Sequence, residues 1–311
     1  MRIIRLLDTT FYPCNFSFFF FVVAKLLLYP SLDMDASFFR VGPYHPPAGS
    51  RRAGREIYRM ENSVSSAALN AAREQLDAAE AAREVILLQH IANGVVIDSR
   101  TVQIAPDVVI APGAVILAGT ILRGRTVIGA GCIIGPNTLI EDSIVDEGST
   151  VNASQVYSSH IGPHNNIGPF THVRVNTVTD YGVHLGAYVE TKNSNFARGN
   201  TVSHLTYIGD SDVGKYCNFG CGTVTCNYDG KDKFRTTIGD YCFIGCNTNL
   251  VAPVKVGDGA YTAAGSTITK DVPAQALGIA RERQTNLEGW AEPKMEAYIA
   301  KKKKLEDEQS K

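Results

Sequence analysis

The chain has 311 residues and a formal net charge of −1, with no long basic stretch ahead of its C-terminus. This charge balance gives no electrostatic reason to expect a nucleic acid as a partner. Glycine is abundant, at 28 residues, and β-branched residues crowd the middle of the chain. Together these features predict a β-rich fold with many tight turns, large enough for one or two domains.

The first 64 residues do not resemble an ordinary folded domain. The segment Phe16 to Tyr29 is apolar but too short for a spanning helix, which needs about 20 residues, and no small-residue cleavage site follows it. Residues 41–58 have the composition of an unstructured linker. We therefore interpret residues 1–64 as a poorly ordered or spurious extension, without stable membrane insertion; a real membrane or export signal is the alternative. The candidate translation starts are Met1, Met34 and Met60.

Residues 65–94 predict a helix, because Ala, Glu and Leu dominate the segment and Asn93-Gly94 is a fitting stop. A partial apolar stripe along this helix predicts that it packs on a neighbouring layer. The stripe consists of Leu69, Leu76, Ile86 and Leu87.

A six-residue recurrence of aliphatic residues fills residues 95–273. Neither the helical period of 3.6 nor the strand period of 2 produces it, so it predicts a repeat architecture. Three hexads would close a triangular rung with the aliphatic side chains inside, and rungs would stack as parallel strands about 4.8 Å apart. Residues 274–311 are then a C-terminal segment with a charged tail. The recurring aliphatics are Ile104, Ile110, Ile116, Leu122, Ile128, Ile134, Ile140, Ile161, Ile167, Val173, Ile238, Ile244, Leu250 and Val256.

Seven cysteines are present, and five of them cluster late in the chain without a C-x-x-C pair. The chain is neither short nor clearly secreted, so a disulfide framework is not expected. Small buried thiols in tight corners are the interpretation we favour over a metal site, and no metal is predicted. The five are Cys217, Cys221, Cys226, Cys242 and Cys246.

The segment 160–289 departs from the plain repeat through long ordered motifs, among them HIGPHNNIGPFTHVRVNT, GAYVETKNS, VSHLTYIGDSDVG, NFGCGTVTCNYDGKDKFRTTIGDYCFIGCNTNLVAPV and GIARERQTNLEGW. Over about residues 67–290 the chain closely resembles the acetyltransferase half of the bifunctional N-acetylglucosamine-1-phosphate uridyltransferase/glucosamine-1-phosphate acetyltransferases. This resemblance implies an all-β, left-handed parallel β-helix of hexapeptide repeats, with the N-terminal helix as its cap. Residues 1–64 show nothing like the nucleotide-binding half, so uridyltransferase activity is predicted to be absent.

The resemblance also implies an activity. A cytoplasmic homotrimer, with its site between subunits, would transfer an acetyl group from acetyl-CoA to glucosamine-1-phosphate. The product, N-acetylglucosamine-1-phosphate, would supply UDP-N-acetylglucosamine for peptidoglycan and the cell wall. His204 matches the family's catalytic histidine, and a neutral imidazole suits the removal of a proton from the attacking amine.

The remaining motif residues divide between the two substrates. Those matching the family's sugar-phosphate contacts are Arg174, Lys192, Tyr207, Asn218 and Lys233. Those matching its acetyl-CoA contacts are Cys221, Asn227, Tyr228, Cys246, Ala264 and Arg281. Among them, Asn227 is interpreted as an orienter of His204 or of the amine. An acyl-cysteine on Cys246 is the less favoured mechanism, because the family transfers the acyl group directly.

Some positions depart from the family's pattern. Val175-Asn176 stands where Pro-Gly is common, and Cys221 and Cys246 replace the usual alanine and serine. These changes leave the acceptor sugar less certain than the acyl transfer. Two other functions therefore remain open: an acyltransferase acting on another amino sugar, and a non-catalytic β-helix scaffold.

Overall fold

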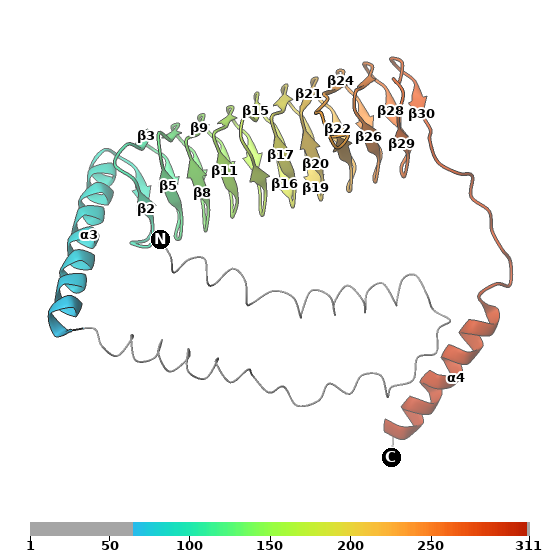
Figure 1. Ribbon diagram of the computed structural model, residues 1–311, viewed down its shortest axis with the longest axis horizontal. Coiled ribbons are helices and arrows are strands. Elements are labelled where there is room, and N and C mark those ends of the chain that lie inside the picture. The colour runs from blue at the N-terminus through green and yellow to red at the C-terminus, as the bar shows by residue number, and fades with distance from the viewer. Residues whose placement is uncertain (1–64, 310–311) are drawn as a thin grey trace. The chain divides into compact units, whose positions relative to one another are not determined.

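A computed structural model describes residues 65–309, and the expectations for residues 1–64 lie outside it. Helix α3 (Ser66–Ala92) is followed by thirty short strands that form three parallel sheets, here called sheets A, B and C (Figure 1). The stacked strands all belong to one compact unit, Arg73–Lys311. The predicted left-handed parallel β-helix of hexapeptide repeats is confirmed.

Each sheet takes every third strand, so that three strands make one rung. Sheet A contains β1 (Val96–Ile97), β4 (Val115–Ile116), β7 (Ile133–Ile134), β10 (Thr150–Val151), β13 (Asn166–Ile167), β16 (His184–Ala187), β19 (Thr201–His204), β22 (Asn218–Phe219), β25 (Phe243–Ile244), β28 (Tyr261–Thr262) and β30 (Leu277–Gly278). Sheet B contains β2 (Gln103–Ile104), β5 (Ile121–Arg123), β8 (Leu139–Glu141), β11 (Gln155–Tyr157), β14 (His172–Val173), β17 (Glu190–Lys192), β20 (Tyr207–Gly209), β23 (Val224–Cys226), β26 (Asn249–Val251) and β29 (Thr267–Ile268). Sheet C contains β3 (Val109–Ile110), β6 (Val127–Ile128), β9 (Ile144–Val145), β12 (His160–Ile161), β15 (Val178–Thr179), β18 (Asn195–Phe196), β21 (Ser211–Val213), β24 (Thr236–Ile238) and β27 (Val254–Val256).

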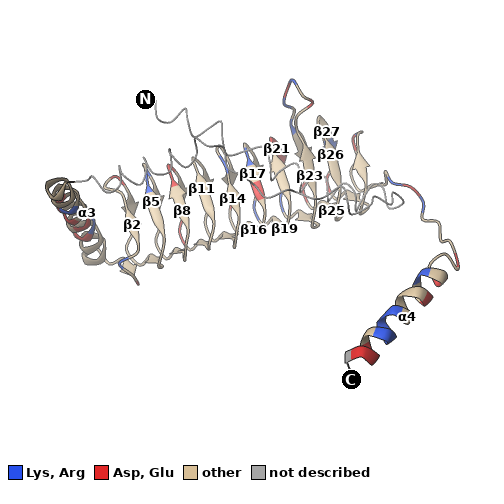
Figure 2. Ribbon diagram, turned by 60° about the horizontal axis from the view of Figure 1, so that its bottom comes forward, with Lys and Arg blue, Asp and Glu red and all other residues tan. Residues whose placement is uncertain are grey.

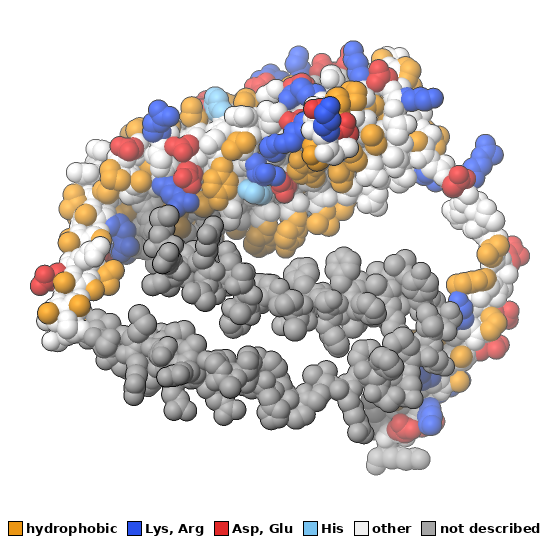
Figure 3. All heavy atoms as spheres, in the orientation of Figure 1, with side chains coloured by type: hydrophobic (Ala, Val, Ile, Leu, Met, Phe, Trp, Pro, Cys, Tyr) orange, Lys and Arg blue, Asp and Glu red, His pale blue; other side chains and the backbone are white. Residues whose placement is uncertain are grey.

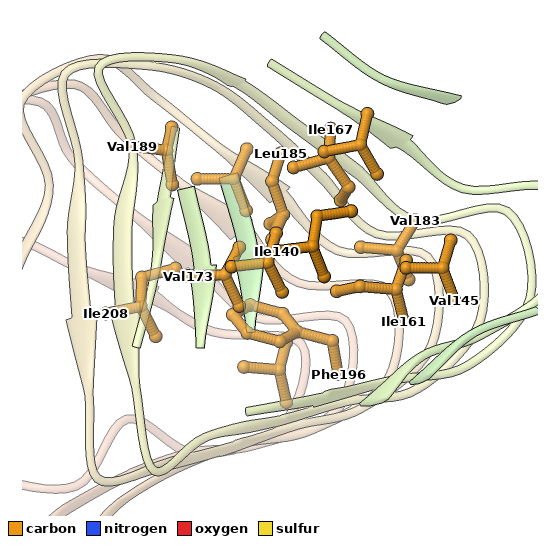
Figure 4. Close-up of a cluster of buried hydrophobic side chains, with 14 of the residues drawn as sticks. Ile140, Val145, Ile161, Ile167, Val173, Val183, Leu185, Val189, Phe196 and Ile208 are labelled. Carbon is orange, nitrogen blue, oxygen red and sulfur yellow. The ribbon is translucent and has the colours of Figure 1, made fainter. Parts of the chain in front are cut away.

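The recurring aliphatics line the inside of the coil, as predicted. None of the fourteen is more than 6% exposed, and each pairs in register with a partner on a neighbouring rung, for example Ile167 with Leu185. Figure 4 shows several of these side chains converging on the interior, Ile140, Val173 and Ile208 among them. Because no rung encloses a core by itself, this continuous interior is what holds the rungs together.

The interior also contains residues that a search for aliphatics every six positions passes over. Several sides of the triangle are one residue shorter, as between Ile140 and Val145, which are both fully buried. Some inward positions are threonines whose hydroxyls are hydrogen-bonded. Thr179 accepts from the Asn165 amide at 2.7 Å. Buried hydroxyls are tolerated there because they have partners.

Helix α3 covers the first rung only through its C-terminal part. Leu87 is 6% exposed and joins the core, and Ile86 packs against it. Arg100 from the first rung forms an ion pair with Glu84 of the helix, at 3.1 Å. The rest of the predicted stripe does not pack on a layer of the described chain, because Leu69 and Leu76 are 57% and 71% exposed.

The C-terminal segment differs from a plain tail. β30 adds one more strand to sheet A after Pro273, and residues Glu292–Gln309 form helix α4. Lysine and glutamate, which dominate that helix (Figure 2), favour helix formation. Across residues 65–309, neither helix combines the length and the apolar character that crossing a membrane requires.

One rung carries an insertion. The corner residues Lys215 and Asp240, which are hydrogen-bonded between neighbouring rungs, are 25 residues apart, whereas Asp240 and Asp258 on the next rung are 18 apart. The extra residues lie between β23 and β24 and form a loop that projects from the coil beside β21 and β27 (Figure 2). An isolated antiparallel bridge between Tyr228 and Lys233 closes this loop.

Candidate functional site

The sequence-predicted residues gather mainly at the two edges of sheet B. At one edge the chain turns from sheet A into sheet B, and at the other it turns from sheet B into sheet C. We call these edges the His204 corner and the Asp210 corner, after the residues that occupy them on the rung containing β20. His204 ends β19 and Asp210 follows β20, so roughly 15–20 Å of extended chain separates the two corners.

The His204 corner contains a column of residues stacked rung upon rung. Backbone hydrogen bonds link consecutive turns, with Asn247 donating to the Cys221 carbonyl at 2.8 Å and Gly265 donating to the Cys246 carbonyl at 2.8 Å. His204 occupies the equivalent place one rung before Cys221. The side chains on the following rungs are small. The column is His204, Cys221, Cys246 and Ala264.

His204 itself is exposed at the end of its strand. It pairs with Ala187 on the preceding rung, and its carbonyl accepts a hydrogen bond from the Thr206 hydroxyl at 2.6 Å. Within residues 65–309, no side chain is hydrogen-bonded to its ring. The ring is therefore exposed and has no side-chain hydrogen-bond partner in the described part of the chain.

Arg281 comes to the same corner from the segment after β30. Its Cδ lies 3.8 Å from the position that a Cβ on Gly265 would take, which places the guanidinium stem beside Ala264. Asn218 lies elsewhere, on the outer face of sheet A between Thr201 and Phe243. It is exposed and lies three residues before Cys221 along the chain.

The Asp210 corner contains the predicted cations. Arg174 follows β14 and Lys192 ends β17, on neighbouring rungs, and the Arg174 amide donates to the Thr191 carbonyl at 2.8 Å. Arg174 also forms an ion pair with Glu190 at 2.7 Å. The Lys233 ammonium, which comes from the inserted loop, is the first cause of a lowered pKa at Lys192, ahead of partial burial. Two amines therefore lie side by side, which suits a phosphate.

Asp210 lies beneath these cations and was not identified from the sequence. It is 5% exposed, and its carboxylate accepts hydrogen bonds from the side-chain amides of Asn193 and Asn227. Burial by itself would raise the pKa of Asp210. The two amides, with Lys192 and Lys233, hold this pKa below its usual value. The carboxylate is therefore charged at neutral pH.

The inserted loop is ordered by its own hydrogen bonds. Asp229 accepts from the backbone amides of Lys231 and Asp232 at 2.8 and 2.7 Å, and the Tyr228 hydroxyl donates to the Gly230 carbonyl at 2.7 Å. Tyr228 is otherwise 59% exposed. The loop therefore presents Tyr228 to solvent from a defined turn.

Arg235 fixes the end of that loop to the coil. Its guanidinium forms a bidentate pair with Asp212, at 2.8 and 2.6 Å, and donates to the Ser211 carbonyl at 3.0 Å. The paired carboxylate raises the pKa of Arg235. This contact, which the sequence did not predict, positions Lys233 two residues earlier. Figure 3 shows basic and acidic side chains gathered near the middle of the coil, with hydrophobic side chains beside them.

Tyr207 connects the two corners across the face of sheet B. Its hydroxyl and the Asn227 amide nitrogen lie 2.4 and 2.8 Å from the position that a Cβ on Gly209 would occupy. The tyrosine side chain therefore runs along the sheet over Gly209 and ends at the Asp210 corner. Only a residue without a side chain leaves room for this arrangement.

One chain thus brings the predicted residues together in two groups. His204 lies with four of the six residues expected to contact acetyl-CoA, namely Cys221, Cys246, Ala264 and Arg281. The other two lie apart from it: Asn227 is at the Asp210 corner with Arg174, Lys192 and Lys233, and Tyr228 is on the inserted loop. The Asn227 amide donates to Asp210 and not to the His204 ring. No group of three or more His, Cys, Asp or Glu side chains in residues 65–309 is arranged to hold a metal ion.

This geometry defines a hexapeptide-repeat β-helix with a polar site at two of its edges. Two family profiles match the chain: the bacterial transferase hexapeptide profile over residues 235–270, and the GMPPB C-terminal domain profile over residues 104–211.

The chain is similar to bifunctional protein GlmU of Caldicellulosiruptor saccharolyticus, with 53% identity over 143 residues, 46% of this chain and 31% of that protein. It is 56% identical to bifunctional protein GlmU of Clostridium perfringens over 139 residues, 45% of this chain and 31% of that protein. The resemblance inferred from the motifs is thereby confirmed. The chain spans about a third of the length of these relatives.

Among solved structures, the UDP-N-acetylglucosamine acyltransferase of Francisella novicida matches 59% of this chain and 66% of its own, with 16% identity and a TM-score of 0.36. At that score the likeness carries no argument.

Proposed function

We propose that the chain is an acetyl-CoA-dependent N-acetyltransferase that acts on glucosamine-1-phosphate and yields N-acetylglucosamine-1-phosphate. The observation that carries this proposal is the identity of 53–56% to GlmU proteins, together with the two groups of motif residues that the fold assembles at the edges of sheet B. Acetyl-CoA is a co-substrate, and the proposed chemistry requires no metal. We also propose that the product supplies the synthesis of UDP-N-acetylglucosamine and that the protein is cytoplasmic.

In the proposed mechanism, the sugar amine attacks the thioester carbonyl at the His204 corner. A C–N bond forms, the C–S bond breaks, and the amine proton passes to His204 and then to the sulfur of CoA. The free ring of His204 supports this role, because a general base must be able to reach the proton. Small side chains at Cys221, Cys246 and Ala264 leave space for the pantetheine arm, and Arg281 is available to a CoA phosphate.

The sugar phosphate is assigned to the Asp210 corner of a different copy of the chain. The distance between the two corners of one chain supports this arrangement, since an amine and its phosphate in one sugar are only a few ångströms apart. We therefore propose a homotrimer in which His204 of one subunit faces Lys192 and Lys233 of the next.

The test is loss of thioester absorbance from acetyl-CoA with a panel of acceptors. Glucosamine-1-phosphate should give turnover, while free glucosamine and a nucleotide-linked amino sugar should give little. The His204→Ala variant should lose about 10²–10⁴ in kcat while its thermal unfolding stays unchanged. Turnover only with another amino sugar, or none from a folded oligomer, would reject this acceptor or this activity.

Mixed oligomers test the shared site. His204→Ala and Lys192→Ala subunits, each inactive alone, should recover activity when they are unfolded and refolded together. Equal recovery by separately refolded variants that are mixed afterwards would argue against a site made by two copies.

A further inference from the structure

Asp210 does not belong to the residues that the motifs assign to either substrate, yet it contacts or faces most of those at its corner. Its backbone is fixed from both sides: its amide donates to the Lys192 carbonyl at 2.9 Å, and its carbonyl accepts from the Thr236 amide at 3.1 Å. It takes a φ of 48°, which non-glycine residues seldom adopt. The surrounding rungs therefore hold the carboxylate in one place.

The carboxylate determines which atom Asn227 presents outward. An ionised carboxylate only accepts hydrogen bonds, so the atom of Asn227 that faces it is the NH2 nitrogen, Nδ2. The Oδ1 atom of Asn227 then points away and receives no hydrogen bond from residues 65–309. Thr236 Oγ1 is the one fully buried side-chain polar atom without a partner in that range, so Asn227 Oδ1 remains reachable from solvent.

The same carboxylate offsets the charge of the lysine pair. Proximity of Lys233 lowers the pKa of Lys192, partial burial and the more distant Arg174 add to the effect, and Asp210 opposes it. Glu190 neutralises Arg174 directly through their ion pair. Without the Asp210 charge, the attraction that raises the pKa of Lys192 against the effect of Lys233 would be lost.

We propose that Asp210 is a positioning residue that orients the Asn227 amide with its oxygen outward and keeps Lys192 and Lys233 together as one cationic pair. An outward carbonyl oxygen recognises an N–H donor, and two adjacent ammonium groups recognise a phosphate. An acceptor that carries both an amine and a phosphate fits this corner. This inference rests on the proposed function and adds to it the residue that organises the acceptor side.

The experiment compares three variants. Asp210→Asn removes the negative charge and places a second side-chain amide against the amide of Asn227. The double variant Asp210→Asn with Asn227→Asp exchanges the two groups, so a negative charge, the hydrogen bond and an outward oxygen all remain. Asp258→Asn is the control, since it removes a carboxylate at another corner of the coil, one whose hydrogen-bond partner is the backbone amide of Asp240.

The readout is kcat/KM for glucosamine-1-phosphate as a function of pH. Asp210→Asn should lower kcat/KM about 10²-fold, as expected when a substrate-positioning group is displaced by about 1 Å. It should also shift the fall of kcat/KM at high pH, the alkaline limb of the profile, to lower pH, because the anion that raised the pKa of Lys192 is gone. The exchanged variant should return the alkaline limb to the wild-type pH, and Asp258→Asn should leave the limb at the wild-type pH.

The inference would be overturned if the alkaline limb of Asp210→Asn lay at the wild-type pH, or if the kcat/KM of the exchanged double variant were no higher than that of Asp210→Asn. If the wild type shows no turnover, the proposed function itself fails, and crystal structures decide this inference. A rotated Asn227 amide and separated lysines in Asp210→Asn would support it, whereas an unchanged corner would refute it.

Discussion

Gly209→Ala tests whether the arrangement across sheet B serves the acceptor. A Cβ at this position would lie 2.4 Å from the Tyr207 hydroxyl and 2.8 Å from the Asn227 amide nitrogen. Both atoms are the far ends of side chains, so the rung can keep its backbone while those two groups move. Gly209 does not have a left-handed φ, and alanine adds no backbone strain there.

The magnitude follows from the contact. An ordinary carbon contact begins near 3.4 Å, so the hydroxyl must retreat from 2.4 Å by about 1 Å. A misplacement of about 1 Å in a substrate-positioning group can cost about 10² in rate. We therefore expect kcat/KM for glucosamine-1-phosphate to fall about 10²-fold, equivalent to about 2.7 kcal/mol in the activation free energy.

The assay is acceptor-dependent loss of the acetyl-CoA thioester, with thermal unfolding measured in parallel. Gly214→Ala is the contrasting variant. Its Cβ would lie 2.5 Å from the Gly239 backbone at a different corner, so it should lower stability and leave the kcat/KM of the folded fraction unchanged. A Gly209→Ala enzyme within twofold of wild type would refute the reasoning about Tyr207.

Three further predictions concern stability and the loop. Ile167→Ala should cost about 2–5 kcal/mol in unfolding free energy, because the side chain is fully buried, while Val178→Ala, 43% exposed, should cost less than about 1 kcal/mol; equal shifts in a denaturant titration would contradict the inward and outward assignment. Arg235→Ala should free the inserted loop and speed its cleavage by protease with little change in overall unfolding, and unchanged cleavage would show that Arg235 does not hold the loop. The pKa of Asp210 is lowered on folding, so its contribution to stability is complete above its unfolded pKa of about 4 and is lost as pH falls through the folded value. The difference in thermal midpoint between wild type and Asp210→Asn should accordingly shrink below about pH 4, and a difference constant with pH would contradict this linkage.

The amino-acid sequence by itself determined the fold class and most of the core. The six-residue recurrence of aliphatics predicted a repeat architecture with these side chains inside, the family resemblance implied its handedness, and every aliphatic of the recurrence is buried. The six-residue recurrence did not identify inward residues where one side of the triangle is five residues long, as at Val145. It also missed the positions where a hydrogen-bonded threonine such as Thr179 points inward. Both depend on contacts between rungs that a single strand does not reveal.

The motif also marked His204 and the cations, because their types and order match a known pattern. Only the tertiary structure decided which of them meet. The triangular rung places Lys192 at one edge of sheet B and His204 at the other, although they are only twelve positions apart. Asp210, which accepts a hydrogen bond from Asn227, was not among the residues that the motif assigned to either substrate. Its role arises from groups on neighbouring rungs and on an inserted loop, and such distant groups are brought together only by stacking.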